Sequence, residues 1–115
     1  MGDLSPHFSA WEFACHDGST HSIDVELLQR LEGLRAELGD HPLRIVSGYR
    51  SVAYNRSIGG AVHSQHLYGR AVDLVAGVCT IAQAQLAGFR GIGHCNGWAV
   101  HLDVRPGVHI TFLDC

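Results

Sequence analysis

The stretch SQHLYGRAVDL places a histidine and an aspartate seven positions apart, with a glycine between them. Its second half alternates as a β-strand does, so Val72 and Leu74 would face the core while Asp73 points to the opposite side. Gly69 allows the chain to turn just before this strand, because glycine adopts backbone conformations that other residues avoid. That turn would bring His66 back towards Asp73. An imidazole beside a carboxylate is half of a metal site.

A second alternating segment, WAVHLDV, repeats this pattern. One face would hold Val100, Leu102 and Val104, and the other would hold Ala99, His101 and Asp103. If the two segments are neighbouring strands, His66, Asp73 and His101 converge on one point. The sequence therefore offers a second histidine for the same site.

Two imidazole nitrogens and one carboxylate oxygen, each about 2.0–2.2 Å from the ion, form a ligand set of the kind that catalytic zinc uses. The fourth position is left for water, whose pKa such an ion lowers to about 7, and the ion also polarises a carbonyl oxygen. Hydrolysis of an amide is the chemistry that suits this arrangement. The competing interpretation is that these are ordinary polar side chains on an exposed face of a sheet.

The clearest of the elements that must position these residues is a helix over SIDVELLQRLEGLRAELG, where apolar residues recur at helical spacing. Ser22 or Asp24 can cap its start, and Gly39 can end it. Shorter helical segments are expected over residues 5–14, with Ser9 as a candidate cap, over residues 51–58, and in TIAQAQLAGF.

Two further segments are expected to be strands: LRIVSG, buried and ending in a turn at Gly48, and VHITFL, a hairpin partner of WAVHLDV. Helices gather early in the chain and strands late, without the regular alternation that a parallel sheet requires. The pattern predicts an α+β domain with a small antiparallel sheet flanked by helices.

The composition limits the classes of function. The 115 residues suit one domain, 1–115, and only 8 are Lys or Arg against a net charge of −3, which argues against a nucleic-acid partner. No signal peptide and no membrane-spanning run is seen, so we expect a soluble protein. The four cysteines include no CxxC pair and permit two disulfides, but we expect free thiols because nothing else marks a secreted chain.

Four motifs, in order along almost the whole chain, carry a resemblance to a known family. Ser64, His66, Gly69, Ala71 and Asp73 match S-x-H-x-x-G-x-A-x-D. This run resembles the first zinc motif of the zinc D-Ala-D-Ala carboxypeptidase family, peptidoglycan peptidases that share a fold with hedgehog signalling domains. SGYRSVAYNRSIGGAVHS resembles a second family stretch, and GIG followed by WAVHLDVR resembles the motif of the last histidine. HFSAWEFAC resembles the opening of small members from phage and bacterial cell-wall hydrolases.

The resemblance implies a role for each matching residue. His66, Asp73 and His101 would bind Zn2+. Arg50 would face the substrate and the developing oxyanion, and Ser64 and Tyr49 would also contact substrate. His63 is a candidate for the rim of the site.

The general base is less clear from the resemblance. Family members place an acidic residue three positions before the last histidine, or a histidine two positions before it, and here Trp98 and Ala99 stand at those positions. Asp103 is the remaining acidic candidate. It would either take a proton as the catalytic base or hold His101 in orientation.

The resemblance implies a zinc metallopeptidase that hydrolyses peptidoglycan stem peptides, as a D-Ala-D-Ala carboxypeptidase or as an endolysin-type endopeptidase. Its place of action would be the cell wall, reached through a phage holin, on a virion or from a bacterium. The alternative is a zinc-containing binding or virion structural module on the same fold. The sequence leaves the peptide bond and the oligomeric state open.

Overall fold

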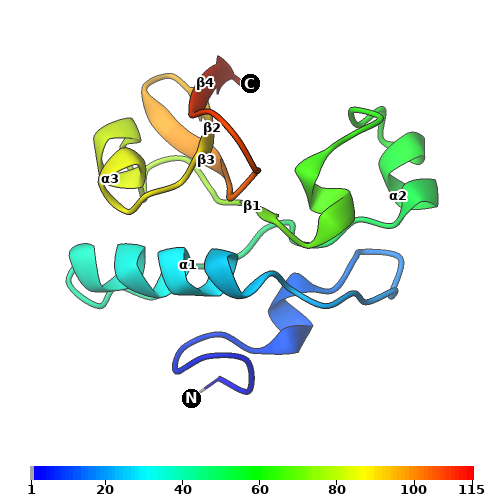
Figure 1. Cartoon of the computed structure of the whole chain (residues 1–115), viewed down its shortest axis with the longest axis horizontal. Coiled ribbons are helices and arrows are strands. Elements are labelled where there is room, and N and C mark those ends of the chain that lie inside the picture. Colours follow the sequence, from blue (N-terminus) through cyan, green and yellow to red (C-terminus); the bar gives the residue numbers. More distant parts are fainter. Residues whose placement is uncertain (1) are drawn as a thin grey trace.

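The computed structural model describes residues 2–115, and its longest element is helix α1 (Val25–Glu37), which lies below the sheet in Figure 1. The side chain of Asp24 accepts a hydrogen bond from the Glu26 backbone N–H at 2.8 Å and so caps the helix. Gly39 follows the last turn with a positive φ of 73°, which glycine adopts without strain. The buried face of α1 consists of Leu27, Leu28, Leu31 and Leu34. The predicted helix and its boundaries are therefore confirmed.

Four short helical segments accompany α1 in residues 2–115, and the sequence predicted three of them as helices. They are η1 (Ala10–Phe13), α2 (Val52–Ser57), η2 (Gln65–Tyr68) and α3 (Ile81–Leu86), although η2 was expected only as a turn. Each begins after a serine or threonine, a residue type whose hydroxyl satisfies free N–H groups in the first turn. None of the helices in residues 2–115 is long and apolar enough to cross a membrane.

The sheet has the strand order β1 (Ala71–Asp73), β3 (Trp98–Asp103), β2 (Gly91–Cys95) and β4 (Ile110–Leu113). β1 pairs antiparallel with β3, so the condition under which His66, Asp73 and His101 would converge is met. β2 and β3 form an antiparallel hairpin whose turn, Asn96–Gly97, has positive φ at both positions, as a tight hairpin turn requires. Val72, Leu74, Ile92 and Leu102 pack on the leucines of α1 in one core.

Two strand predictions are wrong. β4 does not form a hairpin with β3 but pairs parallel with β2, which makes the expected antiparallel sheet a mixed one. The hairpin was inferred from closeness in sequence, whereas the residues after β3 cross back to the far edge of the sheet. The segment 43–48 is not a strand, because its contact with the sheet is limited to an isolated bridge between Ser47 and Asp73.

The alternation along β3 is interrupted at Val100. Gly93 of β2 lies opposite His101, and the next residue of β2, His94, lies opposite Ala99, so Val100 is the extra residue of a β-bulge. A bulge resets the alternation of the faces. Ala99 is therefore buried in the core rather than placed beside His101, and the predicted face is corrected at this residue.

The cysteine prediction is half wrong. Cys15 and Cys79 are free and buried, but Cys95 and Cys115 form a disulfide. The parallel pairing of β4 with β2 brings the C-terminus beside the end of β2, although the two cysteines are 20 positions apart in sequence. Sequence spacing cannot reveal such a pairing.

Candidate metal centre

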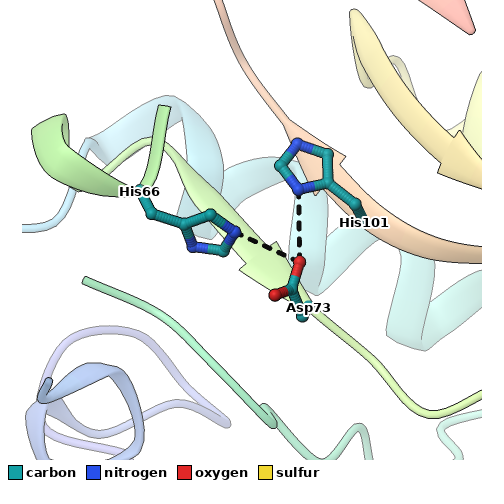
Figure 2. A group of neighbouring side chains, drawn as sticks. All are labelled: His66, Asp73 and His101. Atoms are coloured by element: carbon teal, nitrogen blue, oxygen red, sulfur yellow. Dashed lines mark hydrogen bonds and ion pairs between the residues drawn. The ribbon is translucent and has the colours of Figure 1, made fainter. Parts of the chain in front are cut away.

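Three side chains from three elements meet at one point in Figure 2: His66 from η2, Asp73 from β1 and His101 from β3. Asp73 Oδ1 lies 3.1 Å from His66 Nε2 and 3.2 Å from His101 Nδ1. The three ligand atoms all lie within 4.8 Å of one another. The structure thus brings together the three residues that the sequence singled out as metal ligands.

The turn before β1 sets the position of His66. Ser64 caps η2, with its hydroxyl accepting a hydrogen bond from the backbone N–H of His66. Gly69 ends η2 with a φ of 68°, and a Cβ at this residue would lie 2.3 Å from the carbonyl oxygen of Ser22. A residue with a side chain could not make this turn. Asp73 of β1 and His101 of β3 lie directly opposite each other in the strand pair, and this brings them together with His66.

The outer nitrogen of each imidazole is bound to an acceptor. His66 Nδ1 lies 2.6 Å from the carbonyl oxygen of Gly48, and His101 Nε2 lies 2.7 Å from a carboxylate oxygen of Asp103. Since a carbonyl and a carboxylate only accept, these two nitrogens carry the protons. A neutral His66 and a neutral His101 therefore direct lone pairs at Asp73 Oδ1. Three lone pairs that converge on one point require a positive charge between them.

The electrostatics of the site favour that positive charge. Burial tends to raise the pKa of Asp73, but its contacts with His101 and His66, which become hydrogen bonds when the inner imidazole nitrogens bind a proton, outweigh burial and keep the pKa well below its usual range. Burial likewise tends to lower the pKa of His101, yet its bonds to Asp103 and Asp73 raise it to about 9. A proton or a metal ion can supply the charge, and the two compete for the same lone pairs.

The donor set suits a metal ion such as zinc. Two ligands of a tetrahedral zinc ion at about 2.0–2.2 Å lie about 3.3–3.6 Å apart. The two contacts of Asp73 Oδ1, 3.1 and 3.2 Å, are close to that spacing. Each histidine also has the carbonyl or carboxylate partner on its outer nitrogen that metal-binding histidines usually have.

Asp103 is fully buried, and both of its oxygens have partners. One oxygen accepts the His101 imidazole and the Arg105 guanidinium at 2.7 and 2.6 Å, and the other accepts Arg105 Nε at 2.9 Å and the Arg105 backbone N–H at 3.1 Å. Gly91 makes room for this carboxylate, because a Cβ there would lie 2.2 Å from both oxygens. Of the two roles expected for Asp103, these contacts favour the orientation of His101.

Arg50 lies against the second oxygen of Asp73. Its NH2 group is 3.1 Å from Asp73 Oδ2, and its NH1 group is 3.3 Å from the side-chain oxygen of Asn55. Asn55 in turn donates to the carbonyl oxygen of Ala61, and Gly60 leaves the space that its side chain fills. The SGYR and YN parts of the motif thus form one polar cluster beside the metal ligands.

A cleft of about 400 Å³ opens over the three candidate ligands. Arg50 and Ser64 line it, as the sequence predicted, and so does His63. Tyr49 is not among the lining residues, because its ring stacks on His21 with the ring centres 5.0 Å apart. The cleft is also lined by residues that the sequence reasoning missed, namely Gln65, Arg105, Ile110, Phe112 and Asp114. Most of these lie on or near β4, whose pairing was mispredicted.

Comparisons with known proteins agree with this geometry. A zinc D-Ala-D-Ala carboxypeptidase of Streptomyces albus G is 45% identical over 58 residues, which cover 48% of this chain and 23% of the relative. The chain thus corresponds to less than a quarter of that relative's length. The family described as Peptidase M15 matches residues 6–103, a range that contains all three candidate ligands. Because this match covers most of the sequence, the chain belongs to the Peptidase M15 family.

Proposed function

We propose that this chain is a zinc-dependent peptidase that hydrolyses peptide bonds in peptidoglycan stem peptides, with one catalytic domain over residues 1–115. The observation that carries the proposal is the meeting of His66, Asp73 and His101 at the floor of an open cleft, with both outer imidazole nitrogens already bound to acceptors. Membership of a peptidase family supports the reaction class. The name of the Streptomyces relative supports zinc and a D-Ala-D-Ala substrate.

In this proposal His66, Asp73 and His101 hold the zinc ion. When bound, zinc polarises the peptide carbonyl and makes water a nucleophile near neutral pH. Asp103 keeps the His101 imidazole in the tautomer and orientation that the site needs. Arg50 fixes the free oxygen of Asp73 and, at the wall of the cleft, offers a permanent positive charge to a peptide oxygen.

Ser64 and Tyr49 were expected to contact substrate as well. Ser64 is placed to do so at the wall of the cleft, whereas Tyr49 would need to leave its stack on His21. We therefore propose Arg50 and Ser64 as the substrate contacts of this wall.

The cell wall is the proposed place of action. A disulfide such as Cys95–Cys115 persists outside the reducing cytosol, and peptidoglycan also lies outside the cytosol. Delivery by a phage holin or on a virion stays a prediction from the sequence resemblance.

The test is a digest of purified peptidoglycan with zinc-loaded protein, with and without a chelator, read by mass spectrometry. Chelator-sensitive loss of terminal D-Ala identifies a carboxypeptidase, and release of larger stem fragments identifies an endopeptidase and names the bond. Protein that holds one zinc ion and yields no product from several peptidoglycan types would contradict the proposal. It would favour the zinc-containing binding or virion module instead.

A further inference from the structure

The C-terminal segment places a carboxylate in the cleft. Ile110, Phe112 and Asp114 are alternate residues, so they share one face of the segment that begins with β4, and all three line the cleft. Phe112 packs against the His101 ring, with the ring centres 5.4 Å apart. Asp114 is the next residue on that face and is exposed to solvent.

Asp114 is held at this position by three constraints. Its backbone N–H donates to the carbonyl oxygen of His94 at 2.8 Å, and Leu113 pairs with the same residue of β2. The disulfide from Cys115 to Cys95 fixes the following residue to the end of β2. The carboxylate of Asp114 is thereby fixed to the strand that adjoins His101.

Gly93 shows that the side chains of Asp114 and His101 lie close together. A Cβ at Gly93 would lie 2.8 Å from Asp114 Oδ2 and 2.8 Å from the Cβ of His101. Only a glycine leaves room for both side chains over this strand. The carboxylate of Asp114 therefore lies on the same side of the sheet as His101.

The other carboxylates near the cleft are already engaged. Asp73 contacts both histidines and Arg50, and Asp103 is fully buried with its oxygens bound by His101 and Arg105. Neither has an oxygen free to take a proton from water in the cleft. Among the described residues that line the cleft, Asp114 is the remaining carboxylate that could take a proton from water, and the imidazole of His63 is the alternative acceptor.

We infer that Asp114 is the general base of this site, a proposal that rests on the peptidase function proposed above. The water oxygen forms a bond to the peptide carbonyl carbon while one water proton passes to an oxygen of Asp114. The resulting carboxylic acid then donates that proton to the amide nitrogen as the C–N bond breaks. The products are a carboxylic acid and an amine, and Asp114 returns to its carboxylate form.

The experiment compares wild-type protein with Asp114→Asn, Asp114→Glu and His63→Asn. Asp40→Asn is the matched control, because this exposed carboxylate follows the end of α1 and does not line the cleft. Zinc content per chain and the rate of stem-peptide cleavage are measured for each. We expect Asp114→Asn to keep one zinc ion and lose kcat by at least about 100-fold, since general-base catalysis contributes about 10²–10⁴-fold. Asp114→Glu should recover part of that loss.

A second readout does not depend on turnover. Azide is added stepwise to cobalt(II)-loaded protein, and its binding is followed by the change in the visible absorption spectrum. A carboxylate that faces the open metal position repels this anion. We expect Asp114→Asn to bind azide about tenfold more tightly than wild type, and Asp40→Asn to bind it as wild type does.

The outcomes separate the two proposals. Wild-type protein that releases no product contradicts the peptidase function, and the base assignment fails with it. If wild-type protein is active and Asp114→Asn keeps full turnover, the base assignment alone is overturned. It is also overturned if His63→Asn loses turnover while Asp114→Asn does not. Unchanged azide affinity in Asp114→Asn also overturns it, because the carboxylate would then lie away from the metal.

Discussion

Replacing Asp103 with asparagine tests whether this residue orients His101 or moves a proton. If the side-chain oxygen of the asparagine still accepts the His101 N–H, its amide group must take the place of the other carboxylate oxygen. That oxygen now accepts two donors of Arg105, its Nε at 2.9 Å and its backbone N–H at 3.1 Å. Two donors would then face the N–H groups of the amide. In the other orientation the amide would face the His101 N–H and the second guanidinium donor of Arg105, so asparagine leaves Arg105 donors unpaired in either orientation and His101 unpaired in one of them.

The cost follows from the burial of Asp103, whose side chain is 0% exposed. Breaking a buried charge pair with Arg105 should lower the free energy of unfolding by about 3 kcal/mol. Loss of the partner that orients a metal-binding histidine weakens metal affinity by about 10–100-fold. At 25 °C this corresponds to about 1.4–2.7 kcal/mol of binding free energy.

The assays are urea unfolding, competition for zinc against a chelator of known affinity, and stem-peptide cleavage at saturating zinc. A positioning role predicts weaker zinc binding with at least about a tenth of the turnover restored once zinc is saturating. The opposite pattern, unchanged zinc affinity with turnover lost at any zinc concentration, would refute the positioning role and make Asp103 the base. Asp114→Asn is expected to show that opposite pattern, so the two variants serve as controls for each other.

Two further predictions concern the elements around the site. The Cys95→Ala/Cys115→Ala double variant should keep its zinc and lose at least about tenfold in turnover, because the disulfide no longer holds Asp114 at the cleft. The disulfide also stabilises the chain by about 3 kcal/mol, so urea unfolding should show a loss of that size in the double variant. In Glu26, two hydrogen bonds from Arg90 lower the pKa from 4.5 to about 2, so its contribution to stability is complete above pH 4.5 and is lost as the pH falls towards 2. The difference in unfolding free energy between wild type and Glu26→Gln should therefore be largest at neutral pH and vanish near pH 2; an equal difference at both pH values would contradict this assignment.

The sequence predicts the elements whose signals are local. The capped and amphipathic α1 is one, and the alternating β1 and β3 are others. Because Asp73 and His101 lie on such strands, and Gly69 marks the turn after His66, the meeting of the three side chains could be expected from the order of the residues alone. The family motifs added zinc as the expected ion and peptidoglycan as the proposed substrate.

The parts that failed depend on distant pairing. β2 lies within GIGHC, where a single branched residue between two glycines gives no alternating pattern. Without β2, the natural partner for residues 110–113 was β3, and the parallel pairing that builds one wall of the cleft was missed. The disulfide and the position of Asp114 both follow from that pairing, so neither could be predicted.

The two glycines of β2 explain why this short strand is central to the site. Gly91 provides the space for the carboxylate of Asp103, and Gly93 provides the space for that of Asp114. One carboxylate is buried and bound by His101 and Arg105, while the other is exposed at the cleft. Burial fixes the first as a partner that cannot exchange protons freely, and exposure leaves the second able to do so. In the proposed mechanism the same strand thus separates orientation of a metal ligand from proton transfer, and no acidic residue at position 98 or histidine at position 99 is needed for the second task.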